Sequence, residues 1–141
     1  ASYRFADAVL ANSRALAGEV AALAGVPCAT SYNPTFDAQI DRLLRAPLTH
    51  RWLGRQEFRT ILAAGRLERV KGFDILLQAF AMVCGELPQA RLVLLGEGSL
   101  RKALELQARQ LGIADQVEFA GFQNNPYPWM RAADPAGPSR W

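Results

Sequence analysis

The chain has few of the residues that build metal centres or disulfide frameworks. Among its 141 residues are two cysteines, Cys28 and Cys84, which lie far apart and lack metal-ligand spacing, and one histidine, His50. We therefore expect both cysteines to be small buried residues in a reducing compartment. His50 falls in a segment predicted to be a loop, and one histidine cannot build a metal site alone. A zinc site or a disulfide-rich scaffold is thus excluded.

Long apolar runs and a strong excess of charge are also lacking. No apolar segment approaches the roughly 18 residues of a membrane span, and we expect a soluble intracellular protein without a signal peptide. The formal net charge is +3, and the basic residues are spread along the chain without interleaved aromatics. Such a distribution does not indicate a nucleic-acid partner. A small phosphorylated ligand, in contrast, would need only two or three of these cations.

Half of the residues are hydrophobic, which is typical of a globular chain, and their pattern begins with a strand, a helix and a second strand. The apolar run Ala8–Ala11 predicts the first strand and Pro27–Tyr32 predicts the second. Between them, Ser13 is a candidate N-cap for a helix that ends at about Gly25. Four residues at helical spacing predict its apolar face: Leu16, Val20, Leu23 and Ala24.

Residues 35–57 differ from both neighbours. They are charged, rich in arginine and interrupted by Pro47. We predict a linker here, with one or two helical turns around Asp37–Leu44.

From Phe58 onward, strands alternate regularly with helices. Apolar runs predict strands at 60–64, 91–95 and 116–122, and the first two are continuous enough to be buried on both faces. Helical spacing predicts three helices: Phe73 to about Leu87, one capped by Ser99 that ends at Gly112, and Tyr127–Ala133. This alternation predicts an α/β fold, a Rossmann-like parallel sheet with flanking helices.

Ligands of such sheets bind outside the carboxyl ends of the strands. Three loops follow predicted strands: Gly65–Gly72, Gly96–Ser99 and Gly121–Tyr127. We therefore expect the functional site to lie among these loops.

The first loop combines two glycines with well-placed cations. Gly65 allows a sharp turn at the strand end, and the guanidinium of Arg66 can bind two phosphate oxygens at once. Lys71 and Gly72 precede a helix, whose free N–H groups favour an anion. The pattern predicts a diphosphate site. The alternative is a set of solvated basic residues around an ordinary turn.

The other two loops give weaker signals. The turn Gly96–Ser99 lacks the third glycine of a dinucleotide fingerprint, because Arg101 stands in its place, and this disfavours NAD-dependent redox chemistry. A glycine turn followed by a serine cap is the structural alternative. Gly121 and Phe122 could lie against a base or a ribose, or could simply end a strand.

Several short motifs occur in an order that resembles a known family. The motifs are Ala6–Ser13, Tyr32–Pro34, Gly65–Leu67 with Lys71–Asp74, Ala90–Gly98, and Gly121–Phe122 with Pro126–Pro128. Each motif alone is loose. Their order and separations over nearly the whole chain resemble the GT-B-fold glycosyltransferases of family 4, the group 1 glycosyltransferases.

This resemblance implies a division into domains. Residues 1–34 resemble the end of the N-terminal, acceptor-binding domain, and 35–57 the interdomain linker. Residues 58–141 resemble the first half of the C-terminal, sugar-nucleotide-binding domain, so the chain would hold a partial GT-B C-terminal domain and the tail of the N-terminal one.

The resemblance also implies an activity and its partners. Family members transfer a sugar, as hexosyltransferases do, from a nucleoside diphosphate sugar with retention of configuration, usually without a metal or other cofactor. The acceptor would be a glycan or lipid-linked glycan, and the full-length protein would be cytoplasmic, with peripheral contact to the inner membrane face. By resemblance, Arg66 and Lys71 bind the donor diphosphate. The backbone near the donor would be that of Gly65, Gly72, Gly96, Gly98, Gly121 and Phe122.

The C-terminal end departs from the family pattern. Family members continue beyond Trp141 with two glutamates, separated by seven residues, that contact the donor, so the catalytic residues are not assigned. Two prolines and a glycine in Asp134–Ser139 stand where the family has an apolar strand. We therefore expect the isolated chain to be an inactive, self-associating fragment. The alternative is a non-catalytic nucleotide- or phosphate-binding Rossmann-like module.

Overall fold

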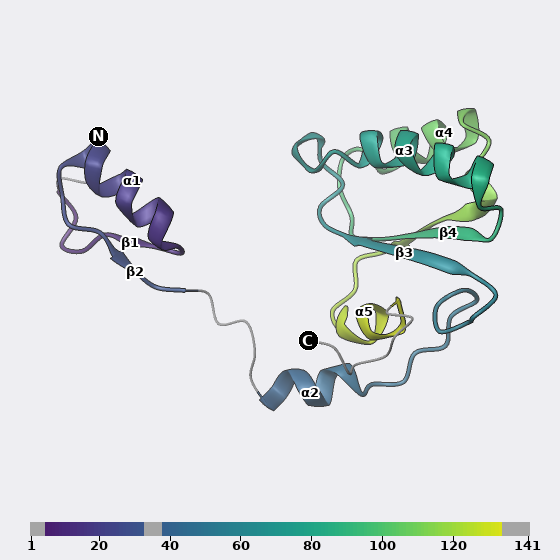
Figure 1. Ribbon diagram of the computed structural model, residues 1–141, viewed down its shortest axis with the longest axis horizontal. Helices are drawn as coiled ribbons and strands as arrows, with labels where there is room; N and C mark the ends of the chain where they lie inside the picture. Colours follow the sequence, from purple (N-terminus) through teal and green to yellow (C-terminus); the bar gives the residue numbers. More distant parts are fainter. Residues whose placement is uncertain (1–4, 33–37, 134–141) are drawn as a thin grey trace. The chain divides into compact units, whose positions relative to one another are not determined.

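The computed structural model describes residues 5–32 and 38–133. The chain divides into two compact units between Ala38 and Gln39. Each unit has its own strands and helices (Figure 1), and each is described by itself. The departure predicted at 134–139 lies outside the described residues.

The N-terminal unit contains two short parallel strands and one helix. Strand β1 (Leu10–Ala11) pairs with β2 (Ala29–Thr30), and α1 (Arg14–Ala24) connects them. The ends of α1 confirm the prediction, because the N–H of Leu16 donates to the hydroxyl of Ser13 over 3.2 Å. At the other end Gly25 takes the left-handed conformation, with φ of 65°.

The predicted apolar face of α1 is confirmed only in part. Ala24 is buried as predicted, together with Ala17, whereas Leu16 and Leu23 are exposed. The contact of α1 with the rest of this unit is thus made by small residues.

The C-terminal unit confirms the α/β prediction. Its three strands are all parallel and lie in the order β3-β4-β5. Helices α3 and α4 cover one face of this sheet and α5 lies on the other (Figure 1). The elements are α2 (Ala38–Leu44), β3 (Arg59–Ala64), the 3-10 turn η2 (Arg69–Lys71), α3 (Phe73–Glu86), β4 (Ala90–Leu95), α4 (Arg101–Gln110), the 3-10 turn η3 (Ala114–Gln116), β5 (Val117–Gly121) and α5 (Tyr127–Ala133).

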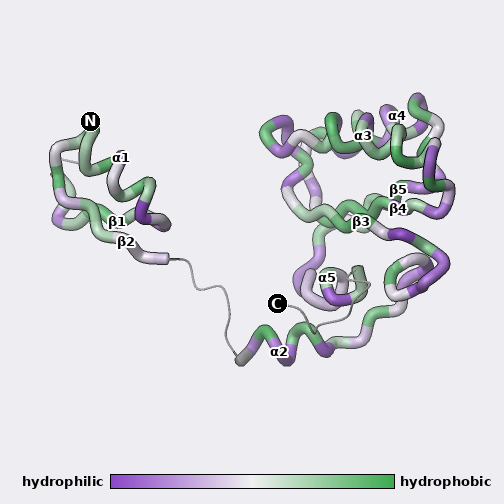
Figure 2. Tube along the Cα trace, viewed as in Figure 1, coloured by the Kyte–Doolittle hydropathy of each residue, from purple (hydrophilic) through white to green (hydrophobic). Residues whose placement is uncertain are grey.

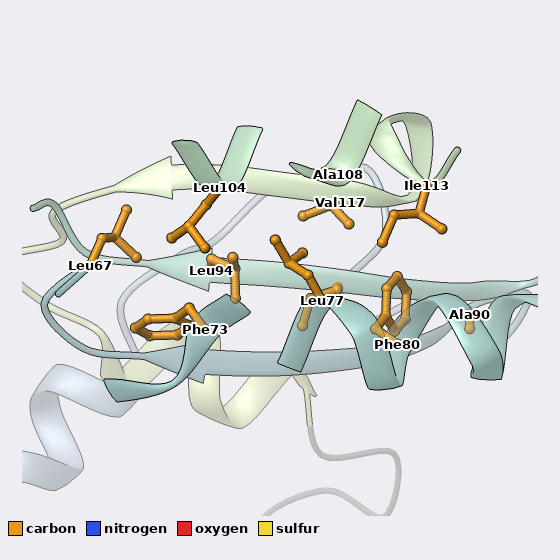
Figure 3. Close-up of a cluster of buried hydrophobic side chains, with 11 residues drawn as sticks. Leu67, Phe73, Leu77, Phe80, Ala90, Leu94, Leu104, Ala108, Ile113 and Val117 are labelled. Atoms are coloured by element: carbon orange, nitrogen blue, oxygen red, sulfur yellow. The ribbon is translucent and has the colours of Figure 1, made fainter. Parts of the chain in front are cut away.

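The main core lies between the sheet and the helices α3 and α4. Side chains alternate between the two faces of a strand, and Leu92 and Leu94 of β4 point to this core. Figure 3 shows the cluster extending along the sheet, from Leu67 past the strand ends to Ala90 and Ile113 at the opposite end. Its buried members are Leu67, Phe73, Leu77, Phe80, Ala90, Leu92, Leu94, Leu104, Ala108, Ile113 and Val117.

A smaller core lies on the other face of the sheet. Val93 and Leu95 of β4 pack there against Trp52, and Trp129 of α5 packs against the same cluster. Trp52 and its neighbour Leu53 are buried, although they fall in the segment predicted to be a linker. Part of that segment is therefore packed onto the sheet.

The prediction that the 60–64 strand is buried on both faces is wrong, whereas β4 is almost completely buried. β3 is an edge strand of the described sheet, and Ile61 within it is 41% exposed. Figure 2 shows that β3 and β4 are nevertheless both hydrophobic. A continuous apolar run therefore did not distinguish a central strand from an edge strand.

No helix within residues 5–32 and 38–133 is long and apolar enough to span a bilayer. Both cysteines are free and half-buried, so the prediction of buried thiols holds only in part. Burial raises the pKa of the Cys84 thiol above its usual value, and the nearby Arg91 opposes the shift.

The two faces of α3 allow a test of the core. Leu77 is 0% exposed and Ile75 is 66% exposed. We expect Leu77→Ala to lower the free energy of unfolding by about 2–5 kcal/mol, because it leaves a cavity, and Ile75→Ala by less than about 1 kcal/mol. Urea denaturation followed by circular dichroism measures both. Equal losses would mean that the helix is packed on a different face.

Candidate phosphate-binding site at the carboxyl ends of the strands

The three loops expected to carry the site meet at one edge of the sheet. The N–H of Gly65 donates to the carbonyl of Leu95 over 2.9 Å, which extends the β3-β4 pairing into the first loop. The N–H of Gly96 donates to the carbonyl of Gly121 over 2.8 Å and connects the second loop to the third. The structure thus brings the predicted loops together through their backbones.

Two of the predicted site glycines have a packing role. A Cβ on Gly96 would stand 1.9 Å from the carbonyl oxygen of Gly65, and Gly96 has a φ of 132°. A Cβ on Gly98 would stand 2.4 Å from the carbonyl oxygen of Leu67. Only glycine therefore allows the β4–α4 loop to lie so close to the loop that carries Arg66.

Arg66 is presented from a backbone that is fixed on both sides. Gly65 before it is bonded to Leu95, and the N–H of Leu67 after it donates to the carbonyl of Glu97 over 2.9 Å. Leu67 is 0% exposed and anchors the loop in the core. The side chain of Arg66 itself is exposed and forms no hydrogen bond or ion pair with any described residue. Its guanidinium is available to a ligand.

Lys71 emerges close to the same point. A Cβ placed on Gly65 would lie 3.8 Å from Cδ of Lys71, so the lysine stem passes beside the residue that precedes Arg66. Gly72 then takes the left-handed conformation, with φ of 64°, and turns the chain into α3. Lys71 is exposed, and within the described ranges its ammonium has no ion-pair partner. The two predicted diphosphate ligands thus start from neighbouring points of one loop, both are exposed, and neither forms an ion pair within the described ranges, whereas Arg69, on the same turn, is also exposed.

Glu68 is a site residue that the sequence analysis missed. Its Oε1 accepts a hydrogen bond from the N–H of Ser99 over 3.0 Å, and its Oε2 accepts one from the Ser99 hydroxyl over 2.8 Å. The prediction that Ser99 caps the next helix is therefore wrong. Its hydroxyl serves Glu68, and α4 begins after Leu100 without a side-chain cap. The sequence signal that could have pointed to Glu68 is its position, as an acidic residue, between basic ones.

The same two hydrogen bonds shift the pKa of Glu68. The Ser99 N–H, then its hydroxyl, and the charge of Arg66 hold the pKa below its usual value, while partial desolvation opposes them. A carboxyl group with a lowered pKa stabilises the fold above its unfolded-state pKa, and this contribution is lost as pH falls through the folded-state value. The contact between Glu68 and Ser99 is therefore complete at neutral pH.

The third loop is held by Arg101. Its guanidinium donates to Glu97, to Oε1 of Glu105 over 3.0 Å and to the carbonyl of Phe119 over 3.1 Å. These bonds fix the end of β5, where Gly121 has a φ of 75°. Phe122 follows and is 71% exposed. The loop therefore presents its backbone and an open aromatic ring on the same edge of the sheet.

The side chain of His50 forms hydrogen bonds that connect the segment before β3 to β5. Its Nδ1 accepts hydrogen bonds from the N–H groups of Trp52 and Leu53, each over 3.1 Å, so Nε2 carries the proton and donates to Glu118 over 3.2 Å. Among residues 5–32 and 38–133, no group of three or more His, Cys, Asp or Glu is placed to hold a metal ion. That the site works without a metal stays a prediction.

A hollow of about 680 Å³ lies elsewhere on this unit. It is lined by the beginnings of β3 and β4, including Thr60 and Ala90, and by Trp52, Phe58 and Leu87. Because the loops of Arg66 and Lys71 follow the opposite ends of these strands, this hollow is not the candidate site. The cations lie on an open edge rather than in an enclosed cavity.

The sequence of the C-terminal unit matches a known family. The model of the family described as "Glycosyl transferases group 1" matches residues 49–135. One relative is an N-acetylgalactosaminyltransferase of Campylobacter jejuni, named for an N-acetylgalactosamine-N,N'-diacetylbacillosaminyl-diphospho-undecaprenol. It is 39% identical over 70 residues, which are 50% of this chain and 18% of the relative's length. The lipopolysaccharide core glycosyltransferase LpsE of Rhizobium meliloti is 38% identical over 74 residues, 52% of this chain and 21% of its own. The chain thus spans about a fifth of these relatives' length.

Solved structures show the same fold. The Anabaena protein HepE in complex with UDP is 28% identical, with a TM-score of 0.69 over 94% of this chain and 38% of its own. TarM of S. aureus has a TM-score of 0.67 at 16% identity, over 84% of this chain and 22% of its own, and shows a likeness of fold alone. The structural neighbours are GT-B glycosyltransferases, as the resemblance predicted.

The close approach of the loops predicts a contrast between two glycines. Gly96→Ala would place a methyl group against the carbonyl of Gly65, whereas Gly85, in α3, has open space around its Cβ position. We expect Gly96→Ala to lower the free energy of unfolding by about 2–4 kcal/mol and Gly85→Ala to raise it by about 0.5–1 kcal/mol. Chemical denaturation compares the two. A Gly96→Ala variant as stable as the wild type would show that the loops can separate freely.

Proposed function

Because this chain belongs to the group 1 glycosyl transferases, we propose that it binds the diphosphate of a nucleoside diphosphate sugar and serves transfer of that sugar to an acceptor. The observation that carries the proposal is the pair of exposed cations, Arg66 and Lys71, which follow the carboxyl end of β3 and form no ion pair with a described residue. Both emerge beside Gly65, on the edge of a parallel sheet where ligands of such folds bind.

The chemistry of the two cations suits a leaving diphosphate. Arg66 presents a planar fork that can bind oxygens of both phosphates, and Lys71 supplies a mobile point charge. As the bond between the sugar and the diphosphate breaks, negative charge grows on the departing oxygen. Cations fixed beforehand at that place stabilise the transition state. Gly65, Gly72, Gly121 and Phe122 would lie along the donor, while Gly96 and Gly98 act from behind through the loop contacts.

The relatives support this choice of ligand. HepE is described in complexes with UDP, with UDP and glucose, and with UDP-glucose. Two relatives are named for lipopolysaccharide core biosynthesis and for a diphospho-undecaprenol acceptor. We accordingly propose a hexosyl donor, retention of configuration and a glycan or lipid-linked acceptor, reached from the cytoplasmic side by peripheral contact with the membrane.

The chemical step would need more protein than these residues. The chain spans about a fifth of the length of the relatives named above. We propose that neither a metal nor another cofactor takes part, because two cations already neutralise the diphosphate. We expect no sugar transfer by the 141-residue chain alone.

Binding of UDP tests the proposal. We expect Arg66→Ala and Lys71→Ala each to weaken binding about 10- to 100-fold, since each removes a charge-assisted hydrogen bond to phosphate. The matched control is Arg69→Ala, which removes the same charge from the same turn and should change the affinity less than about threefold. Isothermal titration calorimetry at constant ionic strength measures all three.

Two outcomes would contradict the proposal. Equal losses in the three variants would indicate a general attraction of anions to a basic turn. Unchanged affinity in Arg66→Ala and Lys71→Ala, with UDP still bound, would place the diphosphate elsewhere.

A further inference from the structure

Glu68 lies between the two candidate diphosphate ligands, and its main chain closes both turns that carry them. The N–H of Glu68 donates to the carbonyl of Arg66 over 2.7 Å, and its carbonyl accepts from the N–H of Lys71 over 3.0 Å. A change in the backbone at residue 68 would therefore move both cations.

The side chain of Glu68 fixes this backbone to the neighbouring loop. Its two carboxylate oxygens accept separate hydrogen bonds from the N–H and the hydroxyl of Ser99, over 3.0 and 2.8 Å. Two bonds from one residue to the two oxygens of a carboxylate fix its rotation as well as its position. We call this contact the 68–99 clamp.

The backbone around the clamp leaves little freedom for another arrangement. The N–H of Leu67 donates to Glu97 over 2.9 Å, and the carbonyl of Leu67 accepts from the N–H of Leu100 over 3.0 Å. Gly98 lies against the carbonyl of Leu67 too closely for a Cβ. The clamp therefore completes a set of contacts that already aligns the two loops.

The clamp also occupies one amide of the second loop. The N–H of Ser99 belongs to the glycine turn before α4, where free amides favour phosphate. Here that amide is already bonded to an internal carboxylate. The side chains of Arg66 and Lys71, in contrast, are exposed and form no hydrogen bond or ion pair with a described residue. An incoming diphosphate would thus meet exposed cations on the first loop and, at Ser99, an occupied amide on the second.

We propose that Glu68 is a positioning residue of the diphosphate site, and that through the 68–99 clamp it holds Arg66 and Lys71 at the separation that one diphosphate requires. The inference rests on the proposed function, because it takes the two cations as the diphosphate ligands. It assigns a role to an acidic residue whose own charge would repel the ligand. Glu68 therefore acts through position and not through contact with the substrate.

The two possible roles of Glu68 predict opposite results. If the carboxylate only repelled the ligand, its removal would tighten the binding of UDP. If it positions the cations, Glu68→Ala and Ser99→Ala should each weaken UDP binding by about threefold to tenfold, the effect of losing a charge-assisted bond next to the site. Glu86→Ala is the matched control, because Glu86 is an exposed carboxylate at the end of α3 and should leave the affinity unchanged.

The pair can be tested as a unit. The double variant should bind UDP no more weakly than Glu68→Ala alone, because residues that act through one contact are not additive. Ser99→Thr keeps both the N–H and the hydroxyl and should restore affinity to within about twofold of the wild type. Additive losses, or a failure of threonine to restore binding, would contradict the clamp. If Glu68→Ala does not fold, the comparison of Ser99→Ala with Ser99→Thr still decides.

A measurement without ligand follows the clamp directly. Amide hydrogen exchange by NMR should become about tenfold faster at Leu67 and Lys71 in Glu68→Ala and Ser99→Ala, because both amides depend on the aligned loops. Exchange in Glu86→Ala should match the wild type. Unchanged protection in both clamp variants would overturn the inference.

Arg66→Ala separates the two failures. If it weakens UDP binding while Glu68→Ala and Ser99→Ala do not, the diphosphate site stands and the positioning role is wrong. If neither Arg66→Ala nor Lys71→Ala has an effect, the proposed function fails and the positioning role fails with it.

Discussion

The contact of two loop backbones at the carboxyl end of the sheet is the constraint on which the candidate site depends. The carbonyls of Gly65 and Leu67 lie where the Cβ atoms of residues 96 and 98 would otherwise be. Hydrogen bonds from Leu67 and Leu100 then connect the loops across this gap. The position of Arg66 depends on this close approach, because hydrogen bonds to the end of β4 and to the next loop fix the backbone of its two neighbours, Gly65 and Leu67.

The rest of the C-terminal unit supports that contact from below. Leu67 is both the link between the loops and a member of the main core, together with Leu77 and Leu94 (Figure 3). The core between α3 and the sheet is therefore connected to the site loop by one buried side chain, that of Leu67. On the other face, His50 and Trp52 hold the preceding segment to the strands. The site loop is therefore stabilised by the core.

Periodicity and turn residues predicted most of the fold. The limits of α3, the left-handed Gly25 and the parallel order of the strands all follow from local patterns that the structure confirms. Exposure was harder to predict, because it depends on what an element packs against. Ile61 lies in an edge strand and Leu16 is exposed on its helix, although the apolar pattern around each residue is typical of a core. Apolar pattern alone does not reveal how many strands lie beside a strand.

The site was predicted in part, for a related reason. Chain position and residue type pointed to Arg66 and Lys71, and both residues are exposed in the structure, although what they bind is a proposal. The contact between Glu68 and Ser99 joins residues 31 positions apart, and no local pattern marks it. Ser99 looked like a helix cap because serine is common there. Only the three-dimensional alignment of the loops shows that its hydroxyl has another partner.

The clamp also bears on how this part of the chain can change during evolution. Glu68 and Ser99 share two hydrogen bonds, so a substitution at one position removes the reason for the other. Gly96 and Gly98, in contrast, are closed to every side chain whatever their neighbours become. Across related sequences, positions 96 and 98 should therefore stay constant one by one, whereas 68 and 99 should vary as a pair. Invariance and covariation would then distinguish steric from hydrogen-bonded constraints at one contact between two loops.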